Sequence, residues 1–307
     1  MNKNLISLSI LSLLLLSGCN GSSNSSSPIP EKQTRSELDF KTSKFSPKSE
    51  QWLSYEEKKN HYLDGNSSEA LYIQYVAKTA IELIDTISEL PQDETKQLTG
   101  IINNLSNHGI ENFYIRVVKN SMGSREDIDF LYEKSGQLYR INEKVALSLI
   151  DFFNEAPSLI HIFDDIEFPT SADTYNDQQI GSSFFEHDVR GLHISNDDAY
   201  RLLEQYDMDN QNALSDCSLN WKREQKKVEN GKMYEKVNNK NVEIGLLEYR
   251  SRLALQCSNG SQPSSNILID DTIMTIYHPT FGHIIHTNAN SLGGTTLTLQ
   301  DLKWVSQ

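Results

Sequence analysis

Residues 187–218 read HDVRGLHISNDDAYRLLEQYDMDNQNALSDCS, and this stretch carries the clearest local pattern in the chain. Three oxygen-bearing side chains alternate near its end, namely Asp207, Asp209 and Gln211. Ile194-Ser195 recurs later as Leu214-Ser215, which leaves room for one short helix over 196–206 between the two pairs. The alternation predicts a loop whose oxygens gather around one cation.

The pattern resembles the twelve-residue calcium loop of an EF-hand, in which oxygen ligands come from alternating positions. Two such loops joined by one helix resemble the compact EF-hand pairs of bacterial exported proteins. The resemblance implies a calcium site whose ligands are Asp207, Asp209, the Gln211 amide oxygen, the Ala213 carbonyl and Ser215.

Two departures from the EF-hand pattern weaken the predicted calcium site. Ser218 stands where the family has a bidentate Glu, so the loop keeps two carboxylates. The first loop places His187, Val189 and Gly191 at its first three ligand positions, and these side chains suit calcium poorly. Two interpretations therefore stay open: a weak site with a dissociation constant of about 10⁻³ to 10⁻⁴ M, or a vestigial loop that binds no metal.

The N-terminal residues predict export and lipid attachment. Lys3 is followed by an apolar run from Leu5 to Leu16, which is too short to cross a bilayer and is typical of a cleaved signal over 1–18. The run ends in Leu-Ser-Gly-Cys, which resembles the lipobox of bacterial lipoproteins. The resemblance implies acylation of Cys19, a lipid bilayer as partner and, with Asn20 next, transport to the outer membrane in a Gram-negative host. Residues 19–50 form the predicted flexible tether.

Two cysteines remain after Cys19, at positions 217 and 257. In an oxidising compartment two leftover thiols most simply pair, so we predict a disulfide between Cys217 and Cys257. Two separately buried thiols are the alternative, because the sequence does not show that the two residues are close.

The charge of the chain is negative and concentrated in one region. Its 42 acidic residues exceed its 28 basic ones, and the formal net charge is −14. Fifteen acids and only two basic residues lie between Asp151 and Asp216. Such a field repels phosphate backbones, so we expect no nucleic-acid partner.

The predicted fold class is α+β, with a helix-rich N-terminal part and a strand-rich C-terminal part. Its predicted regions are a helix-rich domain at 51–168, a linker at 169–183, a helical EF-hand-like unit at 184–220 and a mixed, strand-rich region at 221–307. The strongest predicted helix covers 66–90, where Leu71, Tyr75, Val76, Ala80, Leu83, Ile87 and Leu90 recur at helical spacing. A second helix is predicted at 93–106 and a short strand at 113–117. Residues 219–240 are charged and are predicted to begin as a helix.

Two functions from different classes are consistent with these features. The first is a lipid-anchored envelope protein with a binding or structural role and an unidentified envelope partner. The alternative is an exported hydrolase whose site is assembled from distant residues. Three histidines near the C-terminus are candidates for metal ligands in such a site, namely His278, His283 and His286. The two functions differ in whether these histidines meet an acid in one pocket.

Overall fold

The computed structural model describes residues 40–47, 51–61, 65–122, 126–157, 159, 163–177, 179–181, 183–208, 214–228, 233–259, 262–290 and 293–301. All of these belong to the compact unit Glu37–Gln307. The helical elements are η1 (Phe40–Thr42), α2 (Ala80–Ile87), α3 (Gln92–Asn107), α4 (Glu143–Ser148), α5 (Ile150–Glu155), α6 (Ala172–Asn176) and α7 (Asn196–Gln205).

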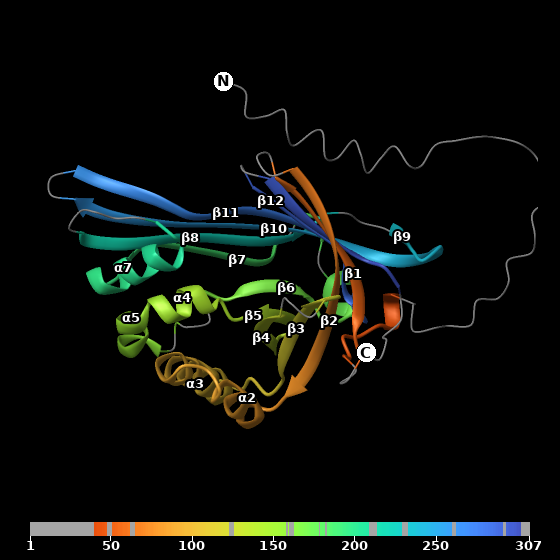
Figure 1. Cartoon of the computed structure of the whole chain (residues 1–307), viewed down its shortest axis with the longest axis horizontal. Coiled ribbons are helices and arrows are strands. Elements are labelled where there is room, and N and C mark those ends of the chain that lie inside the picture. The colour runs from red at the N-terminus through yellow and green to blue at the C-terminus, as the bar shows by residue number, and fades with distance from the viewer. Residues whose placement is uncertain are drawn as a thin grey trace, which may run out of the picture. The chain divides into compact units, whose positions relative to one another are not determined.

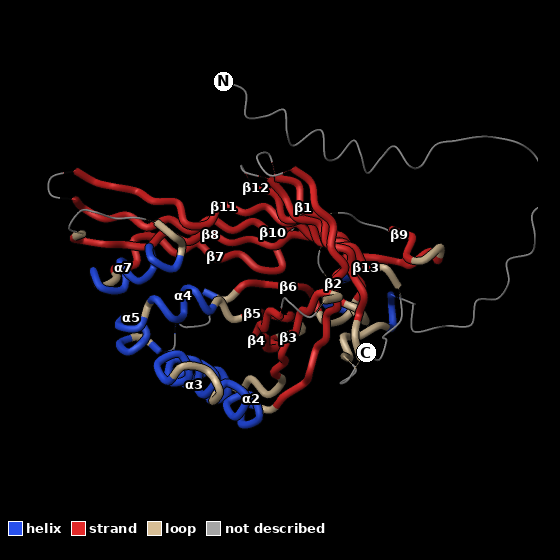
Figure 2. The backbone as a smooth tube through the Cα atoms, viewed as in Figure 1, coloured by secondary structure: helices blue, strands red, loops and turns tan. Residues whose placement is uncertain are grey.

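The strands form one 13-stranded antiparallel sheet (Figure 2). In the sheet they follow the order β6-β5-β4-β3-β2-β1-β13-β12-β11-β10-β8-β7, and β9 pairs with β10. Their bounds are β1 (Leu53–His61), β2 (Gly65–Lys78), β3 (Phe113–Asn120), β4 (Glu126–Lys134), β5 (Gln137–Arg140), β6 (Asp165–Pro169), β7 (Ser183–His193), β8 (Ser215–Lys227), β9 (Met233–Val237), β10 (Lys240–Asn259), β11 (Gln262–His278), β12 (Gly282–Asn290) and β13 (Gly293–Leu299).

The sheet curls until strands near its two ends touch. β6 is the first strand of the order and β8 lies next to the last. The side-chain amide of Gln225 in β8 nevertheless donates to the Glu167 carbonyl in β6 at 3.2 Å. The Tyr249 hydroxyl in β10 donates to Asp165 Oδ1 at 3.1 Å. Figure 1 shows β3 to β6 beneath the long strands β7, β8, β10 and β11, so one face of the sheet is turned inward.

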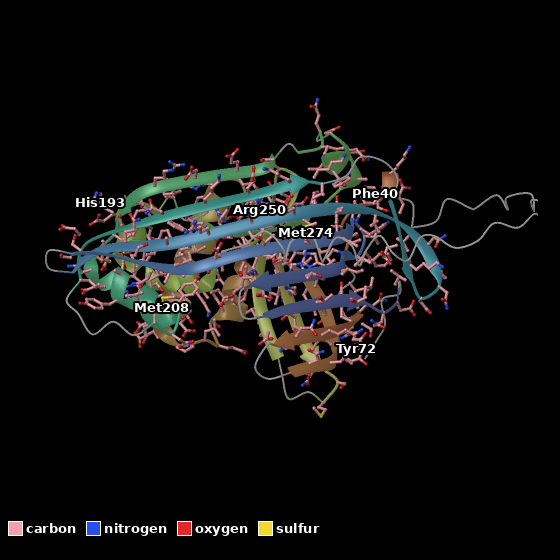
Figure 3. All side chains as sticks on the ribbon, turned by 90° about the horizontal axis from the view of Figure 1, so that it is seen from above. Phe40, Tyr72, His193, Met208, Arg250 and Met274 are labelled. Carbon is pink, nitrogen blue, oxygen red and sulfur yellow. A yellow bond between two sulfur atoms is a disulfide. The ribbon has the colours of Figure 1, made fainter. Side chains whose placement is uncertain are left out.

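Two hydrophobic clusters support this curl. In the first, helices α2, α3, α4, α5 and α7 pack against strands that include β3, β4, β8 and β10, with Trp221 and Phe163 among its fully buried side chains. In the second, aromatic side chains from η1, β2, β6 and β11 pack edge to face or stack on one another, Tyr277 among them. Figure 3 shows β10 and β11, the strands that carry Arg250 and Met274, side by side.

The predicted fold class is wrong, because a large sheet takes the place of the helix-rich part and of the helical EF-hand-like unit. The predicted helix at 66–90 is the strand β2 followed by the short helix α2. Leu71 and Tyr75 fit both periods, but Ile73 is buried between them and β2 pairs with β1 and β3 along its length. Helix α2 begins instead at a capping box formed by Thr79 and Glu82.

The EF-hand-like unit is a strand, a helix and a strand. β7 precedes α7, and after Leu214 the chain enters β8 rather than a second helix. Asp207, with φ of +53°, follows the end of α7, and its N–H donates to the Glu204 carbonyl at 3.0 Å. Ser215 opens β8, and its hydroxyl donates to the Ser258 carbonyl at 3.2 Å. Helix α7 packs Ala199, Leu202 and Leu203 into the first cluster.

Other predicted elements are present. Helix α3 covers the predicted helix at 93–106, and β3 covers the predicted strand at 113–117. The strand-rich C-terminal part contains β11, β12 and β13. The prediction that residues 219–240 begin as a helix is wrong, because residues 219–227 lie in β8.

Candidate functional site

A cavity of about 1200 Å³ lies within the curled sheet. The residues that line it come from β1 to β6 and from β10 to β13, together with the start of α4 and Tyr206 after α7. Strand alternation explains the placement: Arg116 in β3 pairs across the ladders with Asp129 in β4 and Tyr75 in β2, so all three side chains leave the sheet on the inward face. The cavity is therefore built from residues that are far apart in the sequence.

Arg116 holds a network of charges in the wall of the cavity. Its Nε donates to Asp129 Oδ2 and its Nη1 donates to Glu167 Oε2, both at 2.8 Å. Burial lowers the pKa of Arg116, but the two carboxylates outweigh this and raise it well above its usual value. Burial raises the pKa of Glu167, but Arg116 and Arg140 outweigh this and lower it well below its usual range. The pair is therefore ionised on both sides.

Arg140 at the end of β5 extends the network. Its Nη2 lies 3.0 Å from Asp165 Oδ2, its Nε 3.3 Å from Glu167 Oε1, and its Nη1 3.6 Å from Asp129 Oδ1. Two arginines thus share three carboxylates, and the guanidinium groups are already occupied by acids of the chain itself. Such a network is costly to break, because removal of one member leaves an opposite charge buried without its partner.

Two of the three candidate histidines, His283 and His286, line this cavity, and His283 lies next to an acid. His283 Nε2 lies 3.5 Å from Glu167 Oε2, and the rings of His283 and His286 stack with centroids 4.5 Å apart. Burial lowers the pKa of His283 to about 4 and lowers that of His286 well below its usual value. Both rings are therefore neutral at pH 7. His278 does not line the cavity, because its ring packs against Phe40 and Phe281.

Two further acids in the wall of the cavity have raised pKa values. Burial, with Asp129 nearby, raises the pKa of Glu143 to about 7. Burial also raises the pKa of Asp271, and Asp165 and Asp270 add to the shift. Each of these groups lies in an environment that already carries negative charge.

The predicted calcium ligands are only partly described. Asp209, Gln211 and Ala213 lie outside the described residues, and Asp207 and Ser215 have the local partners given above. Within the described ranges, no group of three or more His, Cys, Asp and Glu side chains is arranged to hold a metal ion. Calcium binding by this loop stays a prediction.

The predicted disulfide is present in the structure. Cys217 in β8 and Cys257 in β10 are bonded, with their Cα atoms 4.2 Å apart. Both residues are buried in the first hydrophobic cluster. The bond therefore joins neighbouring strands within the cluster that also contains residues of α5 and α7. Cys19 lies outside the described residues.

The charged network is not among the predicted sites. It includes Arg116, Asp129, Arg140, Asp165 and Glu167. A signal for it existed in the apolar run Phe-Tyr-Ile-Arg-Val-Val at 113–118, where one arginine stands at a position that alternation turns inward. A buried arginine requires acidic partners, which points to acids on other strands. Which strands supply them could not be read from one sequence.

Comparisons with known proteins give only distant likenesses. No protein-family model and no curated protein matches the chain. An inferred exported protein with YmcC-like fold from Bacteroides fragilis is 9% identical with a TM-score of 0.37, over 85% of this chain and 99% of that one. An inferred lipoprotein from Parabacteroides distasonis is 11% identical with a TM-score of 0.36, over 84% of this chain and 97% of that one. Both TM-scores are below 0.5, so we draw no conclusion from either likeness.

In the part of the chain that the structure describes, none of the helices has both the length and the apolar character needed to cross a membrane.

Proposed function

We propose that the chain is a lipid-anchored protein of the bacterial cell envelope whose body binds a small molecule in the cavity of the curled sheet. The lipobox-like sequence before Cys19 and the signal-like run before it support the anchor. The disulfide between Cys217 and Cys257 supports an oxidising compartment. The anchor rests on the sequence alone.

The observation that carries the binding role is the cavity itself. Its volume of about 1200 Å³ is large enough for a small organic ligand, for which sites of about 300–1,000 Å³ are typical. Its wall combines aliphatic side chains from several strands with many charged and polar groups, so it is more polar than most such sites.

The hydrolase alternative has one observation in its favour, the meeting of His283 with Glu167. The acid, histidine and hydroxyl contacts do not form a catalytic triad, however. The hydroxyl that contacts a histidine is that of Thr275, which lies 3.1 Å from His286 Nδ1, whereas the acid contacts His283. Acid and hydroxyl therefore act on different rings, while a catalytic triad needs both on one ring. We favour binding for this reason.

The proposed function is tested by fractionating cells that produce the chain and recording native mass spectra of the purified protein. We expect the wild-type chain in the membrane fraction, with a small molecule bound. An Ile273→Trp variant should stay in the membrane but lose the bound mass, because Ile273 lines the cavity. A Thr272→Trp variant, altered on the outward side of the same strand, should keep it. A Cys19→Ser variant should leave the membrane fraction.

Two results would contradict the proposed function. If the wild-type protein is recovered without any bound small molecule, the proposed binding role is contradicted. If wild type and Cys19→Ser are recovered equally in the membrane fraction, the proposed lipid anchor is contradicted.

A further inference from the structure

The charges of the cavity do not balance. Among the described residues that line it, eight are carboxylates, namely Glu57, Asp127, Asp129, Glu143, Asp165, Glu167, Asp270 and Asp271. The cationic side chains among them are three, namely Arg116, Arg140 and Lys144, and Lys59 outside the lining pairs with Glu57 at 3.0 Å. His283 and His286 are neutral, as shown above. The cavity therefore attracts positive charge and repels anions.

The three cations of the cavity are already engaged. Arg116 and Arg140 donate to Asp129, Asp165 and Glu167. Lys144 places its Nζ over the ring of Tyr206, 5.3 Å from the ring centroid. An anionic ligand would have to displace an acid of the chain from one of the guanidinium groups, and this makes an anion a poor occupant.

Two described residues of the cavity lining have a buried polar atom without a hydrogen-bond partner. His283 is 5% exposed, and its Nε2 lies 3.5 Å from Glu167 Oε2 without a hydrogen bond. Asn288 donates to Asp271 through its amide nitrogen, while its Oδ1 is buried without a partner. A buried acceptor of this kind is costly unless a donor reaches it, so the site calls for a ligand with N–H or O–H groups.

An aliphatic wall lies beside these polar atoms. Ile73 and Val118 face each other across the β2–β3 ladder, and Leu297 and Ile273 line the cavity from β13 and β11. Ile267 is 43% exposed and also lines the cavity, which places an apolar residue where the cavity meets the surface. A bare metal ion would leave this wall and most of the volume without contacts, whereas a hydrocarbon chain would cover it.

We propose that the cavity binds an organic cation, a primary ammonium group carried on an aliphatic chain. The ammonium group lies among the acidic side chains of the lining and donates to the unpaired Asn288 Oδ1, and the chain packs along the aliphatic wall. This inference rests on the proposed function, because it names the class of small molecule that the same cavity takes. The raised pKa values of Glu143 and Asp271 agree with it, since burial and neighbouring acids outweigh Arg140 at both groups, and a bound ammonium group would add the positive charge that lowers them.

The inference is tested by isothermal titration of the mature chain, residues 19–307 with Cys19→Ser, with four probes. Octylamine, octanol and octanoate share a chain and differ in the head group, and spermidine carries amines without a long hydrocarbon chain. We expect octylamine to bind at least about tenfold more tightly than octanol or spermidine, and octanoate not to bind. A Glu143→Gln, Asp271→Asn double variant should weaken octylamine binding about tenfold and leave octanol unchanged.

The matched control is the Asp85→Asn, Glu89→Gln double variant, which makes the same charge change near α2, away from the cavity lining. It should bind octylamine like the parent chain. The single Glu143→Gln variant serves as a second test if the double variant fails to fold, and it should weaken octylamine at least about threefold.

Several outcomes would overturn the inference. Octanol or octanoate that binds as tightly as octylamine would remove the preference for a cation, and so would unchanged octylamine binding in a folded charge variant. Spermidine that binds more tightly than octylamine would contradict the role proposed for the aliphatic chain of the ligand. If octanoate binds and Ile273→Trp abolishes that binding, the ligand class fails while the binding role of the cavity stands. If none of the probes binds although purified protein carries a small molecule, the ligand class alone fails.

Discussion

An Arg116→Met variant is expected to lose about 3–5 kcal/mol of its free energy of unfolding. The Arg116 side chain is 11% exposed, and it neutralises Asp129 and Glu167, whose side chains are 23% and 6% exposed. Methionine fills a similar volume, so the loss reports the carboxylates of Asp129 and Glu167, which then share Arg140 with Asp165, rather than an empty space. Chemical denaturation followed by circular dichroism measures it.

The matched control for this variant is Arg250→Met. Arg250 pairs with Glu248 on the outward face, where its side chain is 65% exposed (Figure 3), and exposed pairs contribute about 0–1 kcal/mol. A triple variant that adds Asp129→Asn and Glu167→Gln to Arg116→Met should regain part of the loss, because no buried charge is then left unpaired. Equal denaturation midpoints for Arg116→Met and Arg250→Met would contradict the account of the network.

Loss of the disulfide is expected to reduce the free energy of unfolding by about 4 kcal/mol in the chain-entropy model. The bond joins residues separated by 40 positions, and it restricts the unfolded chain over that length. A Cys217→Ala, Cys257→Ala variant removes the bond without placing a hydroxyl in the first hydrophobic cluster. Denaturant unfolding of this variant and of the wild-type chain gives the difference.

Reducing agent supplies the control for the disulfide. It should lower the midpoint of the wild-type chain toward that of the double alanine variant and leave the variant unchanged. A wild-type chain with the same midpoint in both conditions would show that the bond contributes nothing to stability.

The charged interior explains why sequence patterns predicted the wrong fold class. In β8 every second residue from Cys217 to Lys227 is buried, and the later ones are Arg223, Gln225 and Lys227. Alternation of apolar and polar residues is the usual sign of a strand, but β8 carries polar side chains on both faces. Because the alternation is lost, the charged residues favour a helix when only the sequence is considered.

The EF-hand resemblance failed for a different reason. Alternating oxygens after a short helix satisfy the local pattern, but they do not determine the element that follows. Cys217, Leu219 and Trp221 alternate just past the loop, and their burial against α5 and α7 favours a strand. A calcium loop and a helix-to-strand connection thus share most of their residue types.

Features that depend on short stretches were predicted more successfully. The amphipathic pattern of α3 and the alternation of β3 are local, and both elements are present. The disulfide followed from the number of cysteines and the compartment. Two of the three histidines do reach one cavity, but their acid, Glu167, comes from a strand more than a hundred residues earlier, and only the curl of the sheet brings it there.

The central claim is that the sheet curls until β6 meets β10 and so forms the walls of the cavity. A double-mutant cycle on Tyr249 and Asp165 tests it most directly, because their hydrogen bond of 3.1 Å spans the two strands. The free energies of unfolding of Tyr249→Phe, Asp165→Ala and the double variant should give a coupling energy of about 1–2 kcal/mol. Effects of the two substitutions that add to within about 0.3 kcal/mol would contradict the contact, and with it the curl of the sheet around the cavity.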